Sequence, residues 1–200
     1  SPNKQAWFSD MKWVDPYRED WVLQINKRLE AVTTTWLSDS VTDFVEYNDE
    51  LYLSTVWWDV WKTTDSTFTE FQLDRTNTQA WACYDLSTFW WSMFYSSDWS
   101  LWKLTTTTYT DSFQTFANDV QPHVMQVFQN RLYISDWNYL AELDDTLAVW
   151  DNSKFELPAD EVILSLAVFW NELAIWTASW TFYLWDWSSA NASQIIPTAL

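Results

Sequence analysis

The most informative absence in this 200-residue chain is glycine, which does not occur at all. Average glycine usage is about 7%, so about 14 are expected, and a complete absence by chance has odds of about one in a million. Tight turns that need a backbone φ above zero normally use glycine. Either other residues adopt that conformation here, or another residue type stands in glycine positions.

Cysteine and histidine are also scarce, with one of each. Cys83 has no partner for an internal disulfide, so we expect a buried, unreactive thiol. His123 follows Pro122 with no nucleophile motif around it, so we expect a surface or strand-edge histidine rather than a catalytic one. The two residues together fall short of a usual zinc ligand set, and no metal site is predicted.

Basic residues are few, and the 10 lysines and arginines face 28 acidic residues, for a formal charge of −18. Such a field repels phosphate groups and anionic lipid, which argues against nucleic acid as a partner. No apolar run reaches the about 18 residues that a membrane helix needs, so no membrane span is predicted. The hydrophobic content of 48% nevertheless indicates a folded chain.

Tryptophan, by contrast, occurs 19 times, often where a turn is expected. Trp57-Trp58, Trp90-Trp91 and the steps Asp98-Trp99 and Asp136-Trp137 become Gly-Gly and Asp-Gly hairpin signals if tryptophan replaces glycine. We therefore interpret most tryptophans as standing in glycine positions. The UGA codon is read as glycine in some bacteria and as tryptophan in others, so reading it the wrong way would put tryptophan in glycine positions. This explanation requires nearly every glycine to be encoded by UGA, so the cause stays open. The alternative is a truly tryptophan-rich protein with stacking platforms for sugars.

An internal repeat of about 40 residues is the strongest signal of fold. Four segments share an aromatic residue, two turn residues and an alternating strand, and they cover residues 47–53, 89–95, 128–134 and 169–175. Their anchor residues Leu51, Met93, Leu132 and Leu173 are spaced by 42, 39 and 41 residues. Short strands at this period are typical of propeller blades.

Each repeat carries a second turn, near Trp58, Trp99, Trp137 and Trp180, followed by another apolar strand. We expect at least three strands per unit joined by hairpins, and a fourth in the Thr-rich link. The prediction is an all-β fold over residues 1–200, either a single β-propeller domain or a section of a propeller, built from four-stranded antiparallel blades of about 40 residues. The units fall near 44–85, 86–123, 124–162 and 163–200, with 1–43 as a partial blade or as lead-in strands that include 22–25 and 29–32.

With glycines at positions 176, 180 and 187, the last unit over residues 173–187 resembles blades of phage and virus virion propellers, and more loosely WD-type repeats. Trp185 is then a genuine tryptophan within Tyr183-Leu184-Trp185-Asp186. Residues 21–27 are similar to the lead-in strand of such virion proteins. The histidine of WD-type Gly-His signatures is missing. The resemblance implies a ring of roughly four to eight blades with a structural role.

Candidate chemistry is sparse. The acidic turns Asp144-Asp145 and Asp160-Glu161 could supply oxygen ligands to calcium, but no Asp-x-Asp-x-Asp loop is present, so we expect solvated carboxylates. The segment 96–102 is similar to the Asp-box turn of sialidase-like propellers, which is a structural hairpin rather than a catalytic site. We therefore predict no catalytic residues, no cofactor and no enzyme activity.

Two functions follow as expectations. The first is a non-enzymatic structural component of a virus or phage particle, a tail-associated or attachment platform located in the virion that contacts other virion chains or copies of itself. The second is a cell-surface or secreted propeller, extracellular, that binds carbohydrate or protein through its loops or channel. Fold alone does not choose between them.

The glycine interpretation makes a direct prediction. Trp58, Trp91, Trp99, Trp137 and Trp180 should have positive φ, and a peptide mass map of the natural protein should show masses lower by the difference between tryptophan and glycine. Peptides with full indole masses at these positions would contradict it and would favour aromatic ligand binding.

Overall fold

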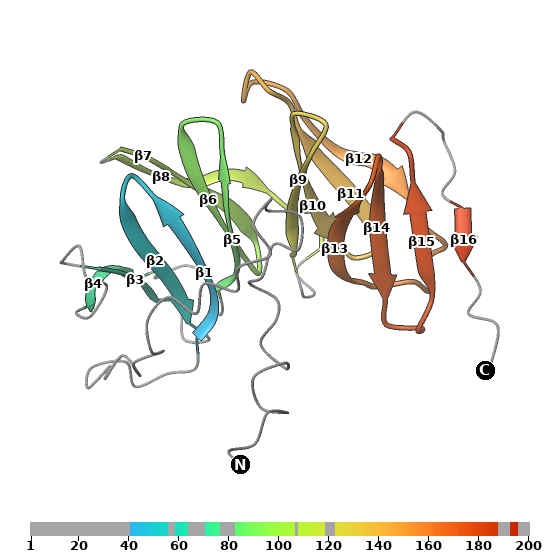
Figure 1. Cartoon of the computed structure of the whole chain (residues 1–200), viewed down its shortest axis with the longest axis horizontal. Coiled ribbons are helices and arrows are strands. Elements are labelled where there is room, and N and C mark those ends of the chain that lie inside the picture. The colour runs from blue at the N-terminus through green and yellow to red at the C-terminus, as the bar shows by residue number, and fades with distance from the viewer. Residues whose placement is uncertain are drawn as a thin grey trace, which may run out of the picture. The chain divides into compact units, whose positions relative to one another are not determined.

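The computed structural model describes residues 41–55, 59–63, 71–76, 83–106, 108–118, 123–187 and 193–195. The chain divides into a unit of Ser1–Val32 and a unit of Thr33–Leu200, and every described residue belongs to the second. Four antiparallel sheets of four strands each make up this part of the chain, arranged as the four blades of a β-propeller (Figure 1). The predicted fold class is confirmed.

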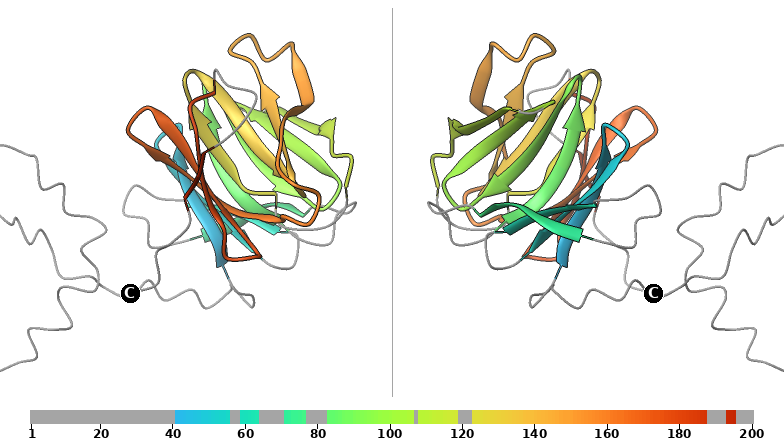
Figure 2. Two further views of the ribbon diagram at one scale, coloured as in Figure 1. Left: turned by 90° about the vertical axis from the view of Figure 1, so that its right-hand side faces the viewer. Right: turned by 90° about the vertical axis from the view of Figure 1, so that its left-hand side faces the viewer.

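In each blade the strands lie side by side in chain order, as Figures 1 and 2 show. Blade 1 contains β1 (Val41–Tyr47), β2 (Glu50–Thr55), β3 (Asp59–Thr63) and β4 (Phe71–Thr76). Blade 2 contains β5 (Cys83–Phe89), β6 (Ser92–Ser97), β7 (Ser100–Thr105) and β8 (Thr108–Thr115). Blade 3 contains β9 (Met125–Phe128), β10 (Arg131–Asp136), β11 (Tyr139–Leu143) and β12 (Trp150–Glu156). Blade 4 contains β13 (Ile163–Phe169), β14 (Glu172–Thr177), β15 (Phe182–Trp185) and β16 (Ser193–Ile195).

The first hairpin of every blade turns at the two residues that the repeat predicts. The register closes on Tyr47 opposite Glu50, Phe89 opposite Ser92, Phe128 opposite Arg131 and Phe169 opposite Glu172. The turns are Asn48-Asp49, Trp90-Trp91, Gln129-Asn130 and Trp170-Asn171. A two-residue connection fixes the register of both strands, and therefore decides which side chains face the neighbouring blade.

Several tryptophans hold a backbone conformation that favours glycine. Trp137 and Trp180 have φ of 64° and 66°, as predicted, whereas the prediction is wrong for Trp91 and Trp99, which do not have positive φ. In two hairpins the first turn residue adopts it instead, with φ of 53° at Trp90 and 58° at Trp170, and Trp187 has φ of 59°.

There is a physical reason why positive φ occurs at the first of the two turn residues. One class of two-residue hairpin needs positive φ at its first central residue, and glycine is usual there. A residue with a Cβ is disfavoured in this region by about 1–2 kcal/mol. The described tryptophans at positive φ thus occupy positions where glycine would remove strain.

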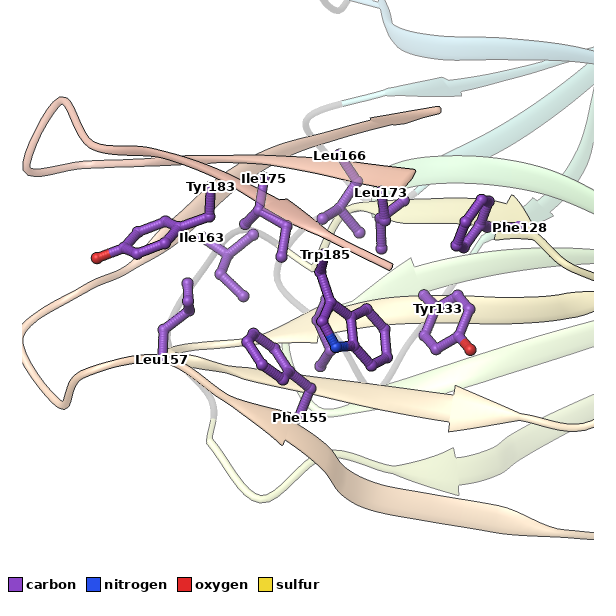
Figure 3. Close-up of a cluster of buried hydrophobic side chains, with 11 residues drawn as sticks. Phe128, Tyr133, Phe155, Leu157, Ile163, Leu166, Leu173, Ile175, Tyr183 and Trp185 are labelled. Carbon is purple, nitrogen blue, oxygen red and sulfur yellow. The ribbon is translucent and has the colours of Figure 1, made fainter. Parts of the chain in front are cut away.

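Apolar contact between consecutive blades forms the core. In the cluster between blades 3 and 4, Trp185 is almost fully buried, stacks on Phe155 with ring centroids 4.8 Å apart, and meets Tyr133 edge-on at 5.4 Å (Figure 3). Trp185 is therefore a core residue, as expected of a genuine tryptophan. Comparable clusters join blades 1 and 2, and blades 2 and 3.

One position of the first, innermost strand recurs in all three interfaces. It lies three residues before the aromatic that precedes the hairpin turn, and it is Leu86 in blade 2, Met125 in blade 3 and Leu166 in blade 4. Each of these side chains is buried in a cluster with residues of the preceding blade. We call the sheet face that carries this position the leading face, and the opposite one the trailing face.

Some predictions fall on residues that the structure does not describe. The strands expected at 22–25 and 29–32, the turn at Trp58 and the side chain of Cys83 all lie outside the described residues. The fourth strand expected in the Thr-rich link is confirmed in blade 2, where β8 begins at Thr108. Among the residues that are described, no helix could cross a membrane.

Candidate functional site

Two aspartates on the innermost strands form a buried carboxyl pair, in which Asp85 has a strongly raised pKa. Asp43 on β1 and Asp85 on β5 occupy the same repeat position, four residues before Tyr47 and Phe89. Their side chains lie close enough to interact. Burial, and then the interaction with Asp43, raise the pKa of Asp85 to about 8. The pair therefore holds a proton where a solvent-exposed aspartate would not.

One oxygen of each carboxyl group binds backbone. Oδ2 of Asp43 accepts a hydrogen bond of 2.8 Å from the N–H of Leu86 in blade 2, and Oδ2 of Asp85 accepts one of 2.5 Å from the N–H of Met125 in blade 3. Each carboxyl group thus reaches from one blade to the leading-face residue of the next. In the third and fourth repeats the equivalent residues are Val124 and Ser165, so this carboxyl link belongs to the first two blades.

The sequence analysis missed this pair. The signal was available, because an aspartate precedes the turn aromatic by four residues in two of the four repeats. What the sequence did not show is that both side chains turn toward the next blade and meet. A buried carboxyl pair that shares a proton could serve acid–base chemistry in an open cleft. Here one oxygen of each carboxyl group accepts a hydrogen bond from the backbone of the next blade, so the pair links consecutive blades.

His123 is also a link between blades. Its side chain is fully buried, so the expectation of a surface histidine is wrong. The ring stacks on Phe116 at 3.9 Å, with Nδ1 2.7 Å from the carbonyl oxygen of Ser135 and Nε2 3.1 Å from that of Asp98. The chain that enters β9 passes between the turn of blade 2 and the second strand of blade 3, which is why the imidazole is enclosed.

Asp136 holds the same junction together. This fully buried carboxylate ends the strand β10 and accepts hydrogen bonds from the backbone N–H groups of Ala117, at 2.7 Å, and Asn118, at 3.0 Å. These two residues follow the last strand of blade 2. Removing the acceptor would leave two backbone donors without it, at a typical cost of about 1–3 kcal/mol each.

The segment 96–102 folds as the predicted hairpin. The Ser97 hydroxyl donates to the carbonyl of Ser100 at 2.9 Å, and the Tyr84 hydroxyl donates to Asp98. Trp102 is buried against Tyr95, with ring centroids 5.3 Å apart, whereas Trp99 at the turn is exposed. The hairpin is thus anchored by its own polar contacts and by packing.

In the first acidic turn considered as a calcium site, the Asp144 carboxylate is hydrogen-bonded within its own loop. Asp144 accepts hydrogen bonds from the N–H groups of Val149 and Ala148 and from the Thr146 hydroxyl, at 3.0, 3.1 and 2.7 Å. The bond from Val149 holds the pKa of Asp144 below its usual range. Asp145 is exposed.

Glu161 is similarly engaged. Burial alone would raise its pKa, but hydrogen bonds led by that of Ser179, with Tyr183 among the others, hold the pKa below its usual range. The neighbouring Asp160 is exposed. No group of three or more potential metal-ligating side chains occurs within the described residues.

Ion pairs link neighbouring strands in blade 3 and in blade 1. Glu142 contacts Arg131 at 2.7 Å and Lys154 at 3.5 Å, and accepts a hydrogen bond of 2.9 Å from the Tyr133 hydroxyl. Burial, followed by the charge of Glu142, raises the pKa of Tyr133. In blade 1, Lys62 similarly contacts Glu50 and Asp74, at 3.2 and 3.6 Å. These groups satisfy one another across neighbouring strands.

Comparison with known proteins gives the fold and little else. No family model matches the sequence, and no curated protein matches it. The computationally designed protein Ika8 superposes with a TM-score of 0.57 and 12% identity, over 76% of this chain and 48% of Ika8. The designed protein Ika4 superposes with a TM-score of 0.61 and 8% identity, over 80% of this chain and 98% of Ika4.

A natural protein is similar as well. PorZ, a surface component of the type-IX secretion system of Porphyromonas gingivalis, has a TM-score of 0.55 and 15% identity, over 79% of this chain and 22% of PorZ. The chain thus spans about half the length of Ika8 and less of PorZ. At such low identity these likenesses show the β-propeller fold alone.

The raised pKa of Asp85 predicts how stability depends on pH. An unfolded aspartate titrates near about 3.9, so between about pH 4 and about pH 8 the folded chain holds a proton that the unfolded chain has released. The free energy of unfolding should therefore fall as the pH rises through this range. We expect a higher urea midpoint at about pH 5 than at about pH 8.

A matched pair of variants isolates the contribution of Asp85. Asp85→Asn, whose amide imitates the protonated acid, should flatten the dependence on pH, and Asp145→Asn at an exposed turn should leave it unchanged. A wild-type midpoint that rises between about pH 5 and about pH 8 would contradict the assignment.

Proposed function

We propose that this chain is a non-enzymatic structural and binding platform, the role expected of a virus or phage particle component. The observation that carries the proposal is how its buried ionisable groups are used. Asp43, Asp85, His123 and Asp136 all bind backbone groups of a neighbouring blade or of the segment that leads from it. They stabilise the array, and what remains for a partner is the outer surface of the blades and their turns.

The turns give specific support to the alternative, a propeller that binds glycan at a cell surface. Trp91 at the β5–β6 turn and Trp170 at the β13–β14 turn are 83% and 86% exposed. Both belong to the first hairpins of their blades, which occupy equivalent positions in the repeat. Exposed aromatic rings offer flat apolar surface with a polar edge, a common element of ligand recognition.

The platform proposal predicts that the chain is a stoichiometric part of a particle. Particles purified on a density gradient from the natural source should contain its peptides in constant ratio to the capsid peptides across the gradient, and a high-salt wash should not remove them. Peptides that stay at the top of the gradient, apart from the particles, would overturn the proposal.

Titration with a panel of oligosaccharides separates the two functions. The platform proposal predicts no saturable change in tryptophan fluorescence. A saturable change that Trp170→Ser abolishes, and that Trp180→Ser at the exposed β14–β15 turn leaves intact, would replace it with glycan binding.

A further inference from the structure

His123 directs both nitrogens of its ring at hydrogen-bond acceptors. Nδ1 lies 2.7 Å from the carbonyl oxygen of Ser135 on β10, and Nε2 lies 3.1 Å from the carbonyl oxygen of Asp98 in the β6–β7 turn. A carbonyl oxygen can only accept a hydrogen bond, so a ring that satisfies both contacts must donate through both nitrogens. The neutral imidazole has one N–H, whereas the imidazolium cation has two. The geometry therefore matches the charged form of the side chain.

A neutral ring would make one of the two contacts unfavourable. Whichever nitrogen lacked a hydrogen would direct its lone pair at a carbonyl oxygen, and two acceptors at hydrogen-bond distance repel each other. The His123 side chain is fully buried, so turning either nitrogen toward solvent would require the junction between blades 2 and 3 to open.

The backbone on either side of the ring fixes its position. The carbonyl of His123 accepts a hydrogen bond of 2.6 Å from the hydroxyl of Ser96 in blade 2. The next residue, Val124, donates its N–H to the Ser135 hydroxyl at 2.8 Å, and its carbonyl accepts from the Ser135 N–H at 2.9 Å. Ser96 and Ser135 are both fully buried. The ring therefore cannot leave its two acceptors without breaking contacts to both blades.

The surroundings of the ring compensate a positive charge. Burial opposes the charged form of a histidine, whereas carbonyl dipoles and nearby carboxylates favour it. Phe116 stacks on the imidazole with ring centroids 3.9 Å apart, and the face of an aromatic ring attracts a cation. The adjoining turn and strand end carry two buried acidic side chains, Asp98 and Asp136.

The other ionisable groups on the adjoining strands add little charge at the ring. The Tyr84 hydroxyl on β5 donates to the Asp98 carboxylate. Burial is the main cause that raises the pKa of Asp85 on β5 to about 8, so this group is largely uncharged at about pH 7. The ammonium group of Lys103 on β7 lies over the ring of Phe113, 4.8 Å from its centroid.

We propose that His123 is a pH-sensitive clamp, in which the imidazolium ring donates to the Asp98 carbonyl of blade 2 and to the Ser135 carbonyl of blade 3. When the ring releases one proton to solvent it keeps a single donor, so one of the two carbonyls loses its hydrogen bond. The clamp is complete at lower pH and weakens as the pH rises through the range in which histidines lose their charge. It rests on the contact between the blades and is independent of what the chain binds.

Nitrogen-15 NMR of the imidazole tests the charge state directly. The chain has one histidine, so selective labelling of this residue type, without an affinity tag, gives a single pair of ring nitrogens. In the folded chain at about pH 5 we expect both nitrogens to have the chemical shift of an N–H group, and one of them to change to that of an unprotonated nitrogen as the pH is raised. A nitrogen that is already unprotonated at about pH 5, or a ring that keeps both protons until the chain unfolds, would overturn the proposal.

Amide hydrogen exchange in the same samples locates the change. The Ser135 N–H, bound to the Val124 carbonyl, reports on the clamp, and the Ala178 N–H, bound to the Val162 carbonyl at 2.8 Å, reports on blade 4. After correction for the intrinsic effect of pH on exchange, protection of the Ser135 N–H should fall as the ring loses its proton, while that of Ala178 stays constant. Equal changes at the two amides would contradict a local clamp.

A His123→Gln variant links the proton to the clamp. Its amide keeps one donor group and one acceptor and never carries a charge. Because only the wild type loses a hydrogen bond here as the pH rises, its urea midpoint should fall further between about pH 5 and about pH 8 than that of the variant. Both chains retain Asp85, so the contribution of that carboxyl group cancels in the comparison. An equal fall in the two midpoints would show that the ring proton does not stabilise the junction, and would overturn the proposal.

Discussion

A four-stranded antiparallel sheet cannot bury its apolar faces alone, and in this chain the burial comes from the next blade in sequence. The contact that recurs is the one made by Leu86, Met125 and Leu166, each set against the turn-proximal aromatic of the preceding blade. Fully burying such a side chain contributes about 1.5–3 kcal/mol relative to leaving it exposed. Because these residues lie at one register position, a two-residue slip or an altered turn would displace several contacts together.

The placement of the buried polar groups follows from that packing. Once the inner strands are held side by side, Asp43 and Asp85 are forced close together, and each can reach the backbone of the next blade. The carboxyl pair keeps a proton because burial disfavours two adjacent charges. His123 and Asp136 use the same principle at the junction of blades 2 and 3, where a loop leaves carbonyl and N–H groups to be satisfied. The ionisable groups thus stabilise the order of the blades.

The period of about 40 residues and the turn residues were enough to predict the blades, because two-residue hairpins and alternating strands leave their mark in local sequence. The polar contacts between blades were not predictable in the same way. His123 has ordinary neighbours in sequence, and its burial depends on Phe116, Ser135 and Asp98, which are brought together by two different blades. The carboxyl pair likewise joins residues 42 positions apart in the sequence.

The turn tryptophans show how far local sequence rules predict the observed backbone geometry. Asn48 and Gln129 adopt positive φ in the first hairpins, and Trp90 and Trp170 do so at the same position. The sequence identified the turns of these hairpins as positions typical of glycine. It could not tell which of two adjacent tryptophans would adopt the left-handed conformation. That choice depends on the turn geometry that the twisted strands accept.

A double-mutant cycle between Phe89 of blade 2 and Met125 of blade 3 tests the packing between blades most directly, since both are buried in one cluster. The free energies of unfolding of Phe89→Ala, Met125→Ala and the double variant should differ from additivity by about 0.5–3 kcal/mol. The same cycle between Phe89 and Leu173, which lie in different clusters, should be additive. Additive effects for Phe89 and Met125 would contradict the account.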